Sequence, residues 1–237
     1  MLRNTEEIKE RIEILQDALK EYTDNYQNPF AMITQIMKTI EEKTPDGLRE
    51  LAKYGWYIDY SHLPKTSIEL GEKLKKGKVE EVDQFLINYY ENELENIETR
   101  LIKKNQHREG VLKEGIQNHR NKNYFSSITL LLTQADGLCY DKSKKLFFKN
   151  NSKLTRRKKY KPEIEEILAN DSVLLLKEFL APMNEPTAIN EHSSNLEKFP
   201  VRLNRHEILH GIDSNYGSKI NSLKIISFLS YINDVLH

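Results

Sequence analysis

The sequence predicts an all-α protein built as a helical bundle. Only 9 glycines and 7 prolines occur in 237 residues, which is few for the tight turns of a β-sandwich or β-barrel. Apolar residues recur every three or four positions along most of the chain, which is the repeat of one helix face. Charged residues make up 30%, with 36 basic and 36 acidic side chains. This composition excludes a collagen-like chain and argues against disorder.

Two helices and an aromatic connection are predicted in the first quarter of the chain. Apolar spacing and acids in the first turn predict a helix from Thr5 to Tyr22. A second helix begins near Pro29, because proline favours the first helical position, and ends at the break Thr44 to Gly47. The aromatic, irregular text from Leu51 to Pro64 predicts a packed connection anchored by a buried Trp56.

Three helices are predicted in the middle of the chain. Uninterrupted apolar spacing predicts one long amphipathic helix from Lys78 to Lys103. Two more follow, from Glu109 to Asn121 and from Tyr124 to Leu138, and the second is apolar enough to lie at the centre of the core. The single cysteine, Cys139, excludes an intrachain disulfide and is expected to be a buried small hydrophobic residue.

The C-terminal part is predicted to hold four further helices. Two short ones run from Pro162 to Ala169 and from Ser172 to Leu180, before a proline-punctuated stretch over 182–200. Two more close the chain, from Val201 to Ile212 and from Ser218 to Leu236, and the last carries its apolar residues on one side.

The chain divides most simply into an N-terminal helical region, 1–105, and a C-terminal helical domain, 106–237. The polar run at 103–110 is the natural linker, although helices of both parts can share one core. No apolar run approaches the roughly 20 residues that a membrane-spanning helix needs, and the N-terminus is too charged for a signal peptide. We therefore expect a soluble, cytoplasmic protein without membrane partners.

A basic stretch runs from Lys142 to Lys161, where ten of twenty residues are Lys or Arg and none is acidic. Its cations could neutralise backbone phosphates, while Phe147, Phe148 and Tyr160 could stack on bases, so the stretch is a candidate RNA-binding segment. A solvated loop whose charge offsets acidic faces elsewhere is the alternative. The candidate RNA-binding residues are Arg156, Arg157, Lys158 and Lys159.

The motif NRHEILHG at 204–211 fits two unrelated patterns. The first is His-Glu-x-x-His, in which His206 and His210 would hold zinc while Glu207 activates a water. A catalytic zinc of this type needs a third protein ligand, and no acid or histidine follows at a suitable spacing. Arg205 would also place a cation beside the metal. We therefore expect no metal site and no cofactor.

The second pattern is an arginine, Arg205, followed after four residues by His210, with the polar His206 directly after the arginine. In the setting FPVRLNRHEILHGIDSNYGSKINSLKIISFL, with the upstream helix YFSSITLLLTQADGL, it resembles the HEPN superfamily, and within it bacterial proteins of uncharacterised or abortive-infection type. The resemblance covers about 120–237 best. It implies a HEPN-like helical fold and, as in many members, a metal-independent ribonuclease that works as a dimer.

The same residues suggest a site on chemical grounds. On a helix, Val201, Arg205, Ile208 and Ile212 would share one stripe, so the Arg205 cation needs a partner such as Asp136, a dimer-related group or a substrate phosphate. A histidine with a pKa near neutrality can move the proton of a ribose 2′-hydroxyl.

In that scheme Arg205 stabilises the transition state, His210 is general acid or base, and His206 assists. Asp136, Tyr216 and Asn221 are expected to support these residues. The plainer alternative makes Arg205 and Asp136 an interior ion pair and the histidines ordinary helix residues. His119 and Arg120 are expected to be solvated at a helix end.

The sequence therefore favours an RNA-cleaving or RNA-binding protein of a defence or toxin-type system, acting as a homodimer with a possible antitoxin or regulatory partner. A non-catalytic helical dimerisation module that keeps the motif for packing is the alternative, and a zinc peptidase is third.

Overall fold

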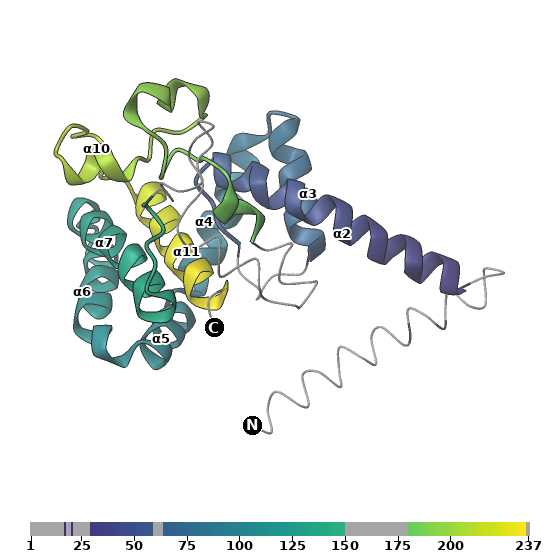
Figure 1. Ribbon diagram of the computed structural model, residues 1–237, viewed down its shortest axis with the longest axis horizontal. Helices are drawn as coiled ribbons and strands as arrows, with labels where there is room; N and C mark the ends of the chain where they lie inside the picture. The colour runs from purple at the N-terminus through teal and green to yellow at the C-terminus, as the bar shows by residue number, and fades with distance from the viewer. Residues whose placement is uncertain (1–16, 18–19, 21–28, 59–63, 150–179, 236–237) are drawn as a thin grey trace. The chain divides into compact units, whose positions relative to one another are not determined.

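The computed structural model describes residues 17, 20, 29–58, 64–149 and 180–235. The chain forms two compact units, Met1–Glu42 and Lys43–His237. Every regular element in the described ranges is a helix (Figure 1), which confirms the predicted all-α class. The helices predicted from Thr5 to Tyr22, Pro162 to Ala169 and Ser172 to Leu180 lie, apart from three residues, outside those ranges.

The first described helix, α2 (Pro29–Lys53), continues through the predicted break at Thr44 to Gly47. Thr44, Pro45, Gly47 and Leu48 are buried, and Gly47 lies so close to the backbone of Ser67 in α3 (Pro64–Lys75) that a side chain would not fit. Tertiary packing of this segment outweighs the helix-breaking tendency of proline and glycine. The prediction of a helix end at this point was wrong.

The long helix predicted from Lys78 to Lys103 is two helices, α4 (Val79–Asn92) and α5 (Leu94–Lys104). They meet at Glu93, whose ψ of 1° leaves the helical range although its N–H still bonds to Tyr89, at 2.9 Å. The buried side chains of Tyr90 and Leu94 are four residues apart, so the apolar repeat stays in phase across the bend. Periodicity alone therefore gave no sign of the break.

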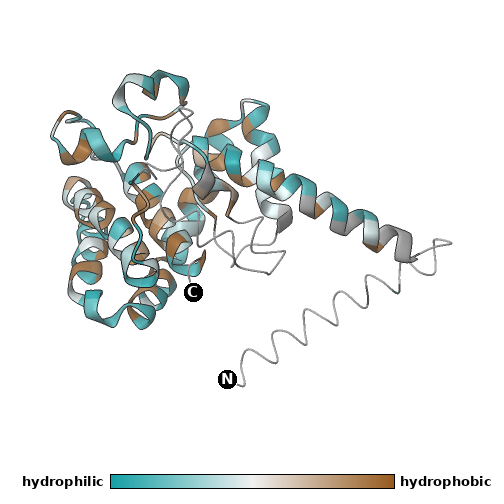
Figure 2. Cartoon of the chain, in the orientation of Figure 1, coloured by the Kyte–Doolittle hydropathy of each residue, from teal (hydrophilic) through white to brown (hydrophobic). Residues whose placement is uncertain are grey.

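Three helices build the centre of the larger unit: α6 (Glu109–Arg120), α7 (Tyr124–Ser143) and α11 (Lys219–Val235). They match the predicted helices, except that α7 runs one turn longer. α11 packs against α7, α4, α5 and α6, and every residue from Ser222 to Asn233 is buried. The apolar face expected for this helix, which includes Leu223, Ile226 and Ile232, is buried, and so are the other sides of the helix. Hydrophobic residues cover much of α11 (Figure 2).

The core draws on both sides of the predicted boundary at residue 105. Its buried apolar residues run from Leu48 to Ile232. Trp56 is fully buried as expected, donates a hydrogen bond to Asp83 at 2.7 Å and stacks on Tyr90. Cys139 is buried as well, and desolvation raises the pKa of its thiol.

Short elements complete the described chain. A single 3₁₀ turn, η1 (Gln106–Arg108), occupies the predicted linker. The proline-punctuated stretch holds two more, η3 (Ala181–Asn184) and η4 (Ser193–Lys198). The helix predicted from Val201 to Ile212 is only α10 (Arg205–Leu209).

His119 was expected to be solvated, and that was wrong. It is 5% exposed, and its Nδ1 lies 2.8 Å from the hydroxyl of Ser222, which in turn lies 3.0 Å from that of Ser127. This chain of polar groups joins α6, α11 and α7. Arg120, by contrast, is exposed and pairs with Glu98 at 2.6 Å.

Burial sets the protonation state of His119. Desolvation lowers the pKa of His119 to about 4. The carboxylate of Glu91 on α4 acts in the opposite direction and raises this pKa, whereas the positive charges of Lys219 on α11 and Arg120 on α6 lower it further. The imidazole is therefore neutral at physiological pH.

We predict that His119 makes the protein less stable in mild acid. The unfolded chain has the higher histidine pKa, near 6.5, so it binds more protons between pH 6.5 and 4, and stability falls as the pH falls through that window. His119→Asn keeps a polar group beside Ser222 and removes this titration. Urea unfolding should show the wild type losing about 2 kcal/mol more than the variant between pH 7 and pH 5. Equal losses in both proteins would contradict the assignment.

Candidate functional site

The histidine motif lies on the short helix α10, which begins at Arg205 because Asn204 caps it. Asn204 has an extended backbone, and its side-chain oxygen accepts a hydrogen bond from the Glu207 N–H at 3.0 Å. The four residues before Arg205 are not helical, and Gly211, with φ of +69°, follows just after the helix. The predicted stripe is therefore broken: Ile212, expected on the apolar side, is 59% exposed.

Asn204 also fixes α10 to the segment that precedes it. Its side chain is fully buried, and its amide donates to the carbonyl oxygens of Ala188 at 2.7 Å and Glu191 at 2.8 Å. The backbone N–H of Arg205 donates to Ile189 at 3.1 Å. The start of the helix therefore has one orientation, and the side chains it carries are held on a rigid support.

Glu207 faces the interior. The residue is 2% exposed, and Arg202 donates to both carboxylate oxygens, at 3.0 Å and 3.1 Å. A water-activating base of a zinc peptidase must instead face the metal that the two histidines hold. Among the described residues, no group of three or more His, Cys, Asp or Glu side chains is arranged to hold a metal ion.

The structure brings Arg205 to Asp136 on α7. The guanidinium nitrogen lies 3.8 Å from the carboxylate oxygen and the guanidinium carbon lies 5.0 Å above the ring of Phe148. Asp136 itself accepts a hydrogen bond from the Phe148 N–H at 3.0 Å. The arginine side chain is 37% exposed, so an acid and an aromatic ring hold it while part of its fork faces solvent.

His206 and His210 are exposed side by side. Their ring centroids are 4.4 Å apart, and the ring of His206 also stacks on that of His192, at 6.3 Å. His192, the cap residue of η4, holds its own Nδ1 against Ser194. His192 was not among the predicted site residues, because it lies in an irregular stretch where no periodic pattern connects it to α10.

Tyr216 and Asn221 make their contacts elsewhere. The Tyr216 hydroxyl lies 2.8 Å from that of Thr129, and its ring packs edge-on against Phe125 near the start of α7. Asn221 donates to the Tyr216 carbonyl at 2.9 Å. Tyr216 fastens the loop between α10 and α11 to α7, and Asn221, on α11, holds the same loop by its backbone; neither contact reaches Arg205, His206 or His210.

The basic stretch is described only up to residue 149. Arg156, Arg157, Lys158 and Lys159 lie outside the described residues. Phe147 is fully buried against Phe228 and cannot stack on a base, which corrects the expectation for this residue. Phe148 is half-buried beneath Arg205.

Within the described ranges, no helix combines the length and the apolar character needed to cross a membrane. Comparisons of the chain with protein-family models, with curated proteins and with solved structures give no match.

We predict that Asn204 is the main determinant of α10 stability. Asn204→Ala removes the cap and leaves two buried carbonyl oxygens without their donor, and it should lower the free energy of unfolding by about 2–4 kcal/mol. The exposed Asn215 provides the control, and Asn215→Ala should change stability by less than about 0.5 kcal/mol. Urea denaturation of both variants checks this. A similar, small effect of the two substitutions would show that Asn204 does not anchor the helix.

Proposed function

We propose that the protein cleaves RNA without a metal, with Arg205, His206 and His210 as its reactive side chains. The observation that carries the proposal is which side chains of α10 are buried and which are exposed. Glu207 and Ile208 are buried and anchor the helix, while the guanidinium of Arg205 is partly exposed and the imidazoles of His206 and His210 are exposed. The resemblance of this segment to HEPN ribonucleases supports the same assignment.

The chemistry requires only groups that these residues provide. A ribose 2′-oxygen attacks the adjacent phosphorus and loses its proton to one imidazole, while the bond to the 5′-oxygen breaks and that oxygen takes a proton from a second acid. Arg205 can place its exposed N–H groups on the phosphoryl oxygens, where negative charge grows in the transition state. Asp136 and the ring of Phe148 hold the guanidinium ready for that contact.

A homodimer completes this scheme. The rings of His206 and His210 are only 4.4 Å apart, so both lie on the same side of a bound phosphate. In-line displacement needs a base and an acid on opposite sides. A second copy of the chain, related by a two-fold axis, would supply the group on the far side. We place this activity in the cytoplasm, as part of a defence or toxin-type system in which an antitoxin or regulatory partner controls it.

One observation favours a second candidate, a non-catalytic dimerisation module. The contact between Arg205 and Asp136 is an ion pair that a purely structural role would also use. In that case the motif would serve packing between copies, and its loss would change the oligomeric state rather than any reaction.

The proposal predicts cleavage of a labelled, structured RNA in the presence of EDTA. Arg205→Ala should lower the rate at least about 100-fold because a transition-state contact is lost, and His210→Ala should lower it about 100-fold or more because proton transfer is lost. Arg49 offers a matched arginine, since its side chain is equally exposed at 37%, and His107 offers a matched exposed histidine.

Arg49→Ala and His107→Ala should cleave at the wild-type rate. The mass of each variant in solution, measured on the same samples, separates the two candidates. Suppose that the wild-type protein forms dimers but leaves RNA intact, and that Arg205→Ala abolishes the dimers. These results would contradict the nuclease and support the dimerisation module.

A further inference from the structure

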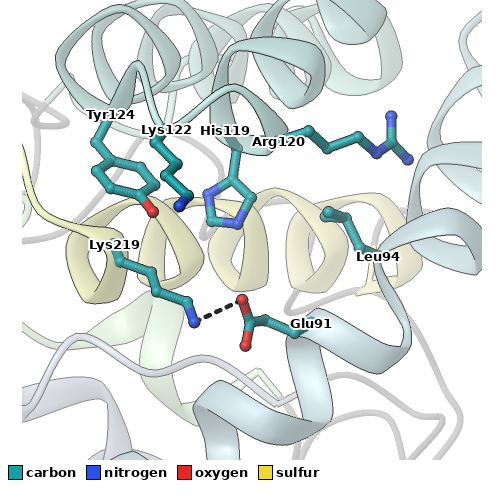
Figure 3. A pocket seen from close by; sticks show the side chains of 7 residues that line it. All are labelled: Glu91, Leu94, His119, Arg120, Lys122, Tyr124 and Lys219. Carbon is teal, nitrogen blue, oxygen red and sulfur yellow. Dashed lines mark ion pairs between the residues drawn. The ribbon is translucent and has the colours of Figure 1, made fainter.

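A pocket of about 440 Å³ lies at the start of α7, away from Asp136, the residue that contacts Arg205. Seven residues line it, drawn from the end of α6, the start of α7, the start of α11 and the region where α4 meets α5 (Figure 3): Glu91, Leu94, His119, Arg120, Lys122, Tyr124 and Lys219. Tyr124 and Asp136 are twelve residues apart on one helix, which separates them by about 18 Å. The pocket is therefore a separate place in the larger unit.

The lining carries more positive than negative charge. Glu91 pairs with Lys219 at 2.7 Å, and Arg120 pairs with Glu98 at 2.6 Å. Lys122 is the third cation of the lining, and among the described residues its ammonium has no hydrogen bond or ion pair. Figure 3 shows the Lys122 side chain reaching down between Tyr124 and His119, toward the pair formed by Lys219 and Glu91. Lys122 is exposed, so its ammonium is accessible to an anion from outside.

His119 gives the pocket a buried polar wall. Its side chain is 5% exposed, and its Nδ1 is held 2.8 Å from the Ser222 hydroxyl. When that nitrogen accepts the serine hydrogen, Nε2 carries the proton of the neutral ring, and within the described residues Nε2 has no partner. Figure 3 shows the ring beside Lys122, with its far edge directed toward the space above the pair formed by Lys219 and Glu91. A bound anion can accept this N–H, which nothing in the described protein accepts.

Backbone groups add to the positive field. The N-terminus of α7 opens at Tyr124, and the side chain of its cap residue, Asn123, makes no capping hydrogen bond. Lys219 is the first residue of α11. The N-terminus of α7 therefore adds partial positive charge that favours an anion, whereas in the first turn of α11 the Ser218 hydroxyl accepts from the Asn221 N–H at 3.2 Å.

From these observations we propose that the pocket binds a phosphate group, either free or carried by a small molecule of nucleotide size. Lys122 and Lys219 provide the charge, His119 provides a directed N–H, and the Tyr124 ring and Leu94 provide apolar surface for the rest of the molecule. A volume of this size falls in the range of small-molecule sites and exceeds what a lone ion needs. This inference does not depend on RNA cleavage at α10.

The test measures binding to the full chain by calorimetry and by the NMR signals of His119, with no RNA present. The three probes are inorganic phosphate, adenosine monophosphate and adenosine. Phosphate and the nucleotide should bind and shift the His119 signals, while adenosine, which has no phosphate, should bind at least about tenfold more weakly than the nucleotide. Tighter binding of the nucleotide than of phosphate would identify a nucleoside phosphate as the source, and equal binding would identify free phosphate.

Two substitutions should move the affinity in opposite directions. Lys122→Asn should weaken phosphate binding about tenfold, because a charged contact is lost, while asparagine accepts the positive φ of 63° at this position. Glu91→Gln should strengthen binding several-fold, since it removes the carboxylate that competes for Lys219. Lys103→Asn, on an exposed face of α5, should leave the affinity unchanged.

The proposal would be overturned by either of two results. One is the absence of binding by both phosphate and the nucleotide. The other is an affinity for phosphate that is the same in all three variants as in the wild type, which would place the anion elsewhere on the protein.

Discussion

The burial of α11 on all sides is the constraint on which the rest of the structure depends. A helix enclosed by α4, α5, α6 and α7 must satisfy every polar group it carries from within the protein. The polar side chains of α11 do so by bonding to a different neighbour in each turn. Ser222 contacts His119, Ser227 accepts from the Tyr57 N–H at 3.3 Å, and Asn233 accepts from Asn105 at 2.9 Å. These bonds set the register of the helices around α11.

The candidate site inherits its rigidity from this core. α7 packs on α11 and carries Asp136, which contacts Arg205, while Asn204 ties the start of α10 to the segment before η4. The same core explains the pocket, because the buried contact of His119 with Ser222 directs the ring outward between two helix starts. At the α10 site and at the pocket, cationic side chains therefore reach solvent from tightly packed helices. This arrangement suits ligands that carry phosphate.

Sequence reasoning located what periodicity and composition control. The bounds of α6 and α11 and the burial of Trp56 were predictable because helical spacing acts locally, and Asp136 was one of the three partners expected for the Arg205 cation. The bend at Glu93 and the uninterrupted course of α2 were not, since both depend on contacts between distant segments. The shortness of α10 has the same origin, because Asn204 is held by carbonyl groups more than ten residues away. His119 was missed because its partner lies on another helix.

The central claim is that the groups exposed on α10 cleave RNA through its own 2′-hydroxyl. The chemical nature of the cut ends tests this most directly, since each mechanism leaves a different pair. Mass spectrometry of RNA treated with the protein in EDTA should find a 2′,3′-cyclic phosphate, or the phosphate derived from it, together with a 5′-hydroxyl. Fragments that end in a 3′-hydroxyl and a 5′-phosphate, or RNA that stays intact, would contradict the account.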